Sequence, residues 1–218
     1  FWSDARKYDA TAMGYVGELC RYLADAPPSP QDRQHHIRKM IGNGMRPNIW
    51  GKFKQRFGVE EIFELYASSE GNVGFSNIFN FDNTVGFSPT PYAIVKYDKE
   101  NNGPVRNAEG HMVKVATGET GLLIGEITKR APFDGYTDPE KNKAVIFTDV
   151  FKKGDRYFNT GDLVRDIGFR HAQFVDRLGD TFRWKGENVS TTEVENLVCG
   201  HDQISEAVAY GVEIENTN

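Results

Sequence analysis

The chain has 218 residues, of which 39% are hydrophobic and 26% charged, a composition typical of a globular protein with a buried core. Its 26 Lys and Arg residues and 31 Asp and Glu residues give a net charge of −5, which disfavours a nucleic-acid-binding protein. No apolar run approaches the ~20 residues that a membrane span needs. Cys20 and Cys199 lack Cys-x-x-Cys spacing, so we expect a reducing, cytoplasmic location and neither a disulfide framework nor a zinc site.

Neither end of the sequence has the features of a protein terminus. The first residues contain no initiator Met and no leader-like apolar stretch. Residues 204–212 predict a strand, and only six residues follow it. We therefore expect the chain to be a segment of a longer protein.

The first third of the chain predicts two helices and a strand. Apolar residues at helical spacing predict an amphipathic helix over residues 12–25. Residues 47–57 predict a second helix, which Gly58 terminates. Residues 62–66 predict a strand that leads into the polar loop 67–72. Active-site groups commonly lie in such loops at the ends of strands.

The middle of the chain predicts an antiparallel β subdomain. Short strands and turns alternate from residue 81 to 133, with strands expected at 93–97, 112–115 and 121–127. Asp138 and Pro139 predict a helix N-terminus, the first as its cap and the second at its first position. Further short strands follow to residue 175, and residues 192–198 predict a last helix.

Three segments carry polar side chains that suit a nucleotide site. Residues 66–71, Tyr-Ala-Ser-Ser-Glu-Gly, offer hydroxyls for phosphate oxygens and a carboxylate for Mg²⁺, although a solvated Ser-rich turn is the structural alternative. Residues 158–162, Phe-Asn-Thr-Gly-Asp, end in an acid that can accept hydrogen bonds from a ribose diol, although an Asx turn gives the same pattern. The third and longest segment is residues 176–195.

In this order, the three segments resemble the adenylate-forming acyl-CoA synthetase superfamily, within it the fatty acid transport protein or very-long-chain acyl-CoA synthetase branch. The stretch GDTFRWKGENVSTTEVE is nearly diagnostic of that branch. The resemblance covers essentially the whole chain through FWSDARKYDATAMGYVGELCRYL, IGNGMRP, ELYASSEGN, PFDGYTDPEKN and YFNTGDLVR. It implies an α/β fold with an antiparallel β subdomain. Residues 1–176 correspond to the C-terminal half of the large AMP-binding domain, 177–180 to a hinge, and 181–218 to the beginning of the small α+β C-terminal domain.

The resemblance implies an ATP-dependent fatty acid–CoA ligase. In such enzymes a carboxylate attacks the α-phosphate of ATP to give acyl-AMP and pyrophosphate, and the thiol of coenzyme A then displaces AMP. The implied substrates are a long-chain or very-long-chain fatty acid, ATP and coenzyme A, with Mg²⁺ as the metal and peripheral membrane contact as an option. A ligase for another hydrophobic carboxylate, such as a bile acid, and a fatty-acid uptake or binding module stay open as alternatives. The family's phosphate loop and late C-terminal Lys are not in the sequence, so we expect the isolated chain to be inactive.

The resemblance also assigns nucleotide-binding roles. Tyr66 corresponds to the ring that stacks on adenine, and Asp162 to the acid that binds the ribose diol. Arg177 corresponds to a guanidinium that holds the nucleotide. The full nucleotide-binding set is Gly42, Asn43, Gly44, Tyr66, Ala67, Ser68, Ser69, Asp162, Phe174 and Arg177.

The implied catalytic residues are Ser69 on the phosphate, Glu70 as the Mg²⁺ ligand, and Lys185. Lys185 and Gly186 match the loop that enters the site for thioester formation and binds coenzyme A. Gly179 corresponds to the hinge position, which is usually Asp or Lys in the family. Ala67 stands where most members have Gly, and Ser69 replaces the usual Thr while keeping the hydroxyl.

Two further groups allow structural and functional interpretations. His35 and His36 are adjacent and therefore cannot share a helix face, so we expect a solvated loop rather than a metal site. Tyr15, Leu19 and Tyr22 fit an acyl tunnel or ordinary core packing of the first helix.

Overall fold

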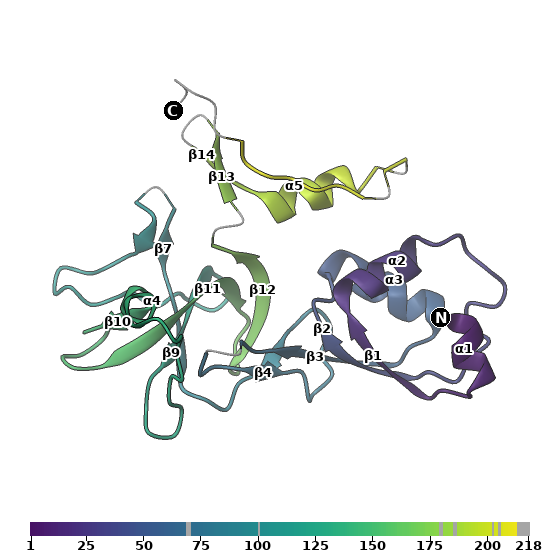
Figure 1. Ribbon diagram of the computed structural model, residues 1–218, viewed down its shortest axis with the longest axis horizontal. Coiled ribbons are helices and arrows are strands. Elements are labelled where there is room, and N and C mark those ends of the chain that lie inside the picture. Colours follow the sequence, from purple (N-terminus) through teal and green to yellow (C-terminus); the bar gives the residue numbers. More distant parts are fainter. Residues whose placement is uncertain are drawn as a thin grey trace. The chain divides into compact units, whose positions relative to one another are not determined.

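A computed structural model describes residues 1–68, 71–99, 101–178, 181–184, 187–201, 203–204 and 206–212. Two compact units make up the chain (Figure 1). The first unit comprises Phe1–Ala67, Gly74–Pro89 and Phe169–Gln173. The second unit comprises Ser68–Val73, Thr90–Gly168 and Phe174–Asn218.

The first unit is built on three parallel strands, β1 (Ala12–Val16), β2 (Lys39–Asn43) and β3 (Glu61–Tyr66). A helix lies in each connection between them, as parallel pairing requires. The sheet continues with antiparallel pairing through β4, β5 and the first residues of β12. Its other elements are α1 (Trp2–Lys7), α2 (Gly17–Asp25), α3 (Pro47–Phe57), β4 (Phe75–Ser76), β5 (Gly86–Phe87) and the beginning of β12 (His171–Arg177).

One face of the parallel strands packs against the helices. Trp50, Phe53 and Phe57, at helical spacing on α3, are each at most 1% exposed and fill the core. Inward side chains of the strands complete the cluster, among them Met13, Tyr15, Met40 and Ile62. On the opposite face, Val16, Ile41 and Leu65 are 39–56% exposed. Parallel sheets are usually covered on both faces, so the described part of this unit shows only one of the two usual layers.

The helix predicted over residues 12–25 is wrong at its beginning, because Ala12–Val16 form β1 and α2 begins at Gly17. Met13 and Tyr15, two residues apart, both point inward from the strand, and pairing with β2 outweighs the helical spacing of Met13 and Val16. A Cβ at Gly17 would lie 1.7 Å from the Gly44 carbonyl oxygen, so this strand-to-helix junction needs a glycine. Of the two alternatives for Tyr15, Leu19 and Tyr22, core packing holds for Tyr15 on the strand and Leu19 on α2, whereas Tyr22 is 55% exposed, so the three do not share one helix face.

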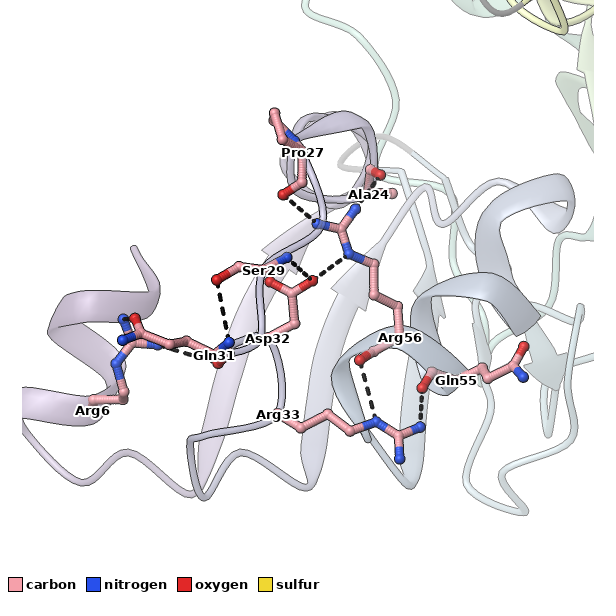
Figure 2. Close-up of polar contacts among 9 residues, drawn as sticks. All are labelled: Arg6, Ala24, Pro27, Ser29, Gln31, Asp32, Arg33, Gln55 and Arg56. Carbon is pink, nitrogen blue, oxygen red and sulfur yellow. Dashed lines mark hydrogen bonds and ion pairs between the residues drawn. The ribbon is translucent and has the colours of Figure 1, made fainter.

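The second predicted helix is confirmed as α3, which begins at Pro47 and ends at Phe57. Gly58 follows in the left-handed conformation, with φ +69°, and its N–H donates to the Lys54 carbonyl oxygen. The end of α3 is tied to the connection between α2 and β2 (Figure 2). Arg56 donates to Asp32 at 2.7 Å and to the carbonyl oxygens of Ala24 and Pro27 at 2.7 and 3.0 Å.

This arginine changes the chemistry of its partner. Burial alone would raise the pKa of Asp32, but the hydrogen bonds from Arg56 and from the Ser29 N–H, together with the nearby positive charge of Arg56, lower it. A second arginine, Arg33, donates to the carbonyl oxygens of Gln55 and Arg56. Together these contacts fix a connection that has no regular secondary structure (Figure 2).

The histidine pair divides between the core and the surface. His35 is 4% exposed and stacks on Trp2 with 4.4 Å between ring centres, so the solvated position predicted for it is wrong. Its adjacent aromatic partner provides the apolar environment that the sequence pattern did not reveal. His36 is exposed, as expected, and contacts the Asp9 carboxylate. Of the two cysteines, Cys20 is buried and Cys199 is partly exposed.

The second unit contains the predicted antiparallel β subdomain. Its main strands pair in the order β6, β9, β11 and β10, all antiparallel. The strand predicted at 112–115 is reduced to isolated bridges, one from Met112 to Arg106 and one from Lys114 to Val95. The strands are β6 (Tyr92–Val95), β7 (Tyr97–Asp98), β8 (Gly103–Pro104), β9 (Thr120–Glu126), β10 (Ile146–Thr148), β11 (Arg156–Asp166), β13 (Thr181–Trp184) and β14 (Glu187–Ser190).

Both predicted helices of the second unit are confirmed. They are α4 (Pro139–Ala144) and α5 (Thr191–Val198). The Asp138 side chain caps α4 by accepting the Glu140 N–H at 2.9 Å. The final strand predicted over 204–212 is wrong for the described residues 204 and 206–212, which have no regular structure and no strand partner there.

Candidate functional site

A β-bulge interrupts β11 at the predicted ribose-binding segment. Asn159 lies opposite Ile124 of β9, and Leu163 lies opposite Leu122, so β11 advances four residues while β9 advances two. Gly161 lies inside the bulge with φ +73°, a conformation that favours glycine. Bulges redirect side chains and are common beside active sites.

Hydrogen bonds hold the bulge in one conformation. The Thr160 hydroxyl donates to the Leu123 carbonyl oxygen at 2.8 Å and accepts the backbone N–H of Asp162 at 3.1 Å. The N–H of Leu178 donates to the Gly161 carbonyl oxygen at 2.6 Å. These contacts fix the backbone that leads into Asp162.

The bulge brings Asp162 to Arg177, the residue at the end of β12. Arg177 Nε lies 2.8 Å from Asp162 Oδ1, and Nη2 lies 3.4 Å from Oδ2, a two-pronged contact. The Asp162 side chain is 2% exposed, whereas that of Arg177 is 58% exposed. Phe174, three residues before Arg177 on the same strand, is 37% exposed. Three of the predicted nucleotide-binding residues therefore lie on these two strands.

Of the other predicted nucleotide-binding residues, Gly42, Asn43, Gly44, Tyr66 and Ala67 lie in the first unit, and Ser68 belongs to the second. Gly42 pairs with Glu64 across the parallel strands β2 and β3. The predicted loop Gly42-Asn43-Gly44, whose first two residues are the end of β2, and Tyr66 therefore both lie at the carboxyl ends of neighbouring strands. Asn43 and Gly44 are exposed, and Tyr66 is partly exposed. The Tyr66 ring meets Phe75 edge-on, with 5.8 Å between ring centres. Ligands of open α/β sheets bind at this kind of edge.

Sequence reasoning missed a buried carboxylate behind this loop. Glu64 is 4% exposed and accepts hydrogen bonds from the Tyr15 hydroxyl and from the backbone N–H groups of Gly44 and Met45. Burial raises the pKa of Glu64 to about 7, although its three donors act in the opposite direction. One sequence pattern could have revealed it. Glu64 lies two residues after the apolar Ile62 on a strand, so the two side chains share the inward face.

Sequence reasoning also missed Asn72, which anchors the loop after the Ser-Ser-Glu segment in the second unit. Its carboxamide nitrogen donates to the carbonyl oxygens of Glu126 at 2.7 Å and Ala131 at 3.1 Å. A Cβ at Gly125 would lie 2.2 Å from the Asn72 Oδ1, so the glycine leaves room for this side chain. Nothing in the sequence separates Asn72 from an ordinary polar loop residue.

No family model matches the chain. The sequence is 49% identical over 217 residues to the medium/long-chain-fatty-acid–CoA ligase FadD6 of Mycobacterium tuberculosis, covering 100% of this chain and 36% of the relative. It is 47% identical over 224 residues to the long-chain fatty acid transport protein 2 of Rattus norvegicus, covering 98% of this chain and 36% of the relative. The chain belongs to this family of fatty acid–CoA ligases and fatty acid transport proteins. It spans about a third of the length of the curated relatives it matches.

Solved structures show that this family segment has the adenylate-forming fold. ATP-bound MatB from Rhodopseudomonas palustris matches with a TM-score of 0.64 and 21% identity, over 89% of this chain and 36% of that chain. A benzoate CoA ligase from Burkholderia xenovorans LB400 also matches with a TM-score of 0.64 and 21% identity, over 99% of this chain and 40% of that chain. The predicted fold class, the C-terminal half of an adenylate-forming enzyme, is thereby confirmed.

Several predicted residues of the family's site lie outside the described residues. These are Ser69, Glu70, Gly179, Lys185 and Gly186. Of the described residues, no group of three or more His, Cys, Asp or Glu side chains comes together as a metal site. In the same part of the chain, no helix is long and apolar enough to cross a membrane.

Proposed function

We propose that the full-length protein converts long-chain or very-long-chain fatty acids to acyl-CoA through an acyl-AMP intermediate. In the first step a fatty acid carboxylate oxygen attacks the α-phosphorus of ATP, and pyrophosphate leaves. In the second step the sulfur of coenzyme A attacks the acyl carbonyl carbon, and AMP leaves. The observation that carries the proposal is the Asp162–Arg177 pair on the β11 bulge.

The chain's own residues supply recognition of the nucleotide. Each carboxylate oxygen has two lone pairs, so Asp162 can accept hydrogen bonds from two ribose hydroxyls while it still binds Arg177. The exposed face of the Arg177 guanidinium supplies a positive charge beside the nucleotide. In this proposal Tyr66 stacks on adenine, and the Gly42–Gly44 loop lies along the adenine edge. Ala67, Ser68 and Phe174 complete the contact set.

We assign binding of the phosphate groups to the residues after Tyr66. Ser69 offers a hydroxyl to the phosphate, and Glu70 offers a hard oxygen ligand to Mg²⁺. Mg²⁺, when bound, neutralises charge on the phosphates. Two residues after Glu70, the Asn72 side chain donates to the carbonyl oxygens of Glu126 and Ala131.

We assign the second half-reaction, thioester formation, to the small domain. We propose that this domain begins after a hinge at residues 177–180. Gly179 at the hinge has the backbone freedom that a domain rotation needs. In the sequence, Lys185 and Gly186 lie between Trp184, the last residue of β13, and Glu187, the first residue of β14. We assign these two residues to coenzyme A and to thioester formation.

The names of the relatives are the basis for proposing a long-chain fatty acid as the substrate. FadD6 is named as a medium/long-chain-fatty-acid–CoA ligase and the rat relative as a long-chain fatty acid transport protein, and each is more than 45% identical to this chain. A long-chain acid partitions into lipid, which supports a cytoplasmic protein in peripheral contact with a membrane.

The deciding experiment is ATP–pyrophosphate exchange by the full-length protein with and without a fatty acid. A ligase exchanges label only when its acid is present, whereas an uptake or binding module retains fatty acid and shows no exchange. A panel of acids of increasing chain length, together with a bile acid, then measures kcat/KM for each. Preference for the bile acid over every fatty acid would overturn the substrate assignment.

A further inference from the structure

The loop Gly42-Asn43-Gly44 is fixed from two sides within the first unit. On one side, the Gly44 carbonyl packs so closely on Gly17 that a Cβ there would lie 1.7 Å from the oxygen. A Cβ at Gly42 would lie 2.0 Å from the Tyr15 carbonyl oxygen. Backbone therefore packs directly on backbone, with no side chain between them.

Glu64 fixes the same loop from the other side. Its Oε1 accepts the N–H of Gly44, and it accepts the N–H of Met45 at 3.2 Å. Its Oε2 accepts the Tyr15 hydroxyl from β1. One carboxylate thus joins the end of β2, the middle of β3 and β1.

If Glu64 served only to fill the core, burying its carboxyl group would be an unfavourable choice. Glu64 is 4% exposed, and among the described residues no Lys or Arg pairs with it. Burying an acid without a cation costs several kcal/mol, and an apolar residue of similar volume is often as good or better for stability. The cost is understandable if the position of the Gly44 and Met45 N–H groups matters for more than the core.

Glu64 also links the loop to Tyr66. The acid and the ring lie two residues apart on β3, and Asn43 and Gly44 are exposed at the neighbouring strand end. The same strand therefore carries the proposed adenine-stacking ring and the group that holds the proposed adenine-edge loop. A shift of the loop relative to Tyr66 would change the space for the base.

We propose that Glu64 is a positioning residue for nucleotide binding, which holds the Gly42–Gly44 loop at a fixed place relative to Tyr66. This inference rests on the proposed function of that loop. Glu64 does not touch the nucleotide. It acts through the two backbone N–H groups that it holds.

The test compares Glu64→Leu, which fills the same space without an acceptor, with Glu64→Gln, which keeps an acceptor oxygen for the two N–H groups. In the full-length protein, Glu64→Leu should raise KM for ATP about tenfold, with kcat and KM for the fatty acid within about threefold of wild type. Glu64→Gln should restore KM for ATP to within about threefold. The matched control is Glu60→Gln, which removes an exposed charge next to the same strand and should change neither constant.

Two results would overturn the assignment. The first is a Glu64→Leu protein with a lower melting temperature and an unchanged KM for ATP, because Glu64 would then serve stability alone. The second is a Glu64→Gln protein as impaired as Glu64→Leu, because an acceptor oxygen would then not be what matters.

A nucleotide-independent measurement separates this inference from the proposed function. If the wild-type protein shows no ATP–pyrophosphate exchange, the proposed function fails, and hydrogen exchange of the Gly44 and Met45 amides still tests the positioning. These amides should exchange at least about tenfold faster in Glu64→Leu than in Glu64→Gln. Equal exchange rates would overturn the role of Glu64.

Should Glu64→Leu not fold, Glu64→Ala takes its place in both measurements. Should that also not fold, Glu64→Gln must match wild-type amide exchange, or the role is overturned.

Discussion

Arg177 Nε lies 2.8 Å from Asp162 Oδ1, although the two residues are fifteen positions apart and lie on different strands. The carboxylate is almost completely buried, while the arginine is more than half exposed. An exposed ion pair contributes little to stability. Removing the arginine from a buried acid leaves the carboxylate without the group that holds it in place. The pair is therefore better suited to orienting a carboxylate than to stabilising the fold.

Asp162→Ala in the full-length protein should raise KM for ATP by about 100-fold, because two ribose hydroxyls lose a charged acceptor in a buried site. KM for coenzyme A should change by less than about threefold. Both constants come from steady-state assays with the third substrate saturating. The matched control is Asp166→Asn at the end of the same strand, where the side chain accepts the Gly168 N–H and the amide can do the same. An unchanged KM for ATP in Asp162→Ala would remove this residue from the site.

Thr160→Val should lower both stability and nucleotide affinity. The substitution keeps the shape of Thr160 but loses its hydrogen bonds to the Leu123 carbonyl and the Asp162 N–H. We expect the free energy of unfolding to fall by about 2 kcal/mol and KM for ATP to rise, because the bulge that aims Asp162 relaxes. Urea unfolding and ATP kinetics measure the two effects. Thr160→Ser retains the hydroxyl and should stay close to wild type, and a normal KM in Thr160→Val would show that the bulge holds without it.

The sequence predicts those elements whose ends need particular backbone chemistry. Pro47 and Gly58 frame α3, and Asp138 with Pro139 begins α4, because each residue has a φ or a hydrogen bond that suits only that position. The sequence did not predict β1, because Met13 and Val16 lie three residues apart, a spacing that fits one face of a helix. Their pairing with β2, a non-local interaction, makes this segment a strand instead.

In the candidate site, too, local sequence patterns predict some features, whereas non-local contacts decide others. Asp162 and Arg177 follow from a family motif, but their contact depends on a bulge that appears only when β11 pairs with β9. Glu64 was missed because a charged residue in a strand is ordinarily assigned to the solvent face. Its partners Tyr15 and Gly44 are 49 and 20 residues away, so no local pattern reveals the contact.

Glu64 should make the protein less stable as pH rises from about 4.5 to 7. Burial raises its pKa from 4.5 in the unfolded chain to about 7, so in this interval the folded state holds a proton that the unfolded state releases. The stabilisation is complete below pH 4.5 and is lost as pH passes 7. The loss attributable to Glu64 is at most about 3 kcal/mol.

The pH dependence is measured by urea unfolding at intervals across this range, in wild type and Glu64→Gln. The glutamine cannot titrate, so the difference in slope between the two proteins isolates Glu64 from other groups such as His35, whose pKa is lowered by burial. Parallel slopes would mean that the acid keeps its ordinary pKa in the folded protein.

Lys185→Ala should separate the two half-reactions. Lys185 follows the proposed hinge at Gly179, so a domain rotation would bring it to the reacting groups in only one of two orientations. ATP–pyrophosphate exchange should stay within about threefold of wild type, whereas transfer from a supplied acyl-AMP to coenzyme A should slow by about 100-fold. Single-turnover assays measure each step separately. Lys153→Ala, which removes an exposed lysine from a turn of the second unit, is the matched control for loss of charge and should leave both steps unchanged. Equal losses in the two half-reactions, or none in either, would rule out a role in only one orientation and leave Lys185 as a solvated residue.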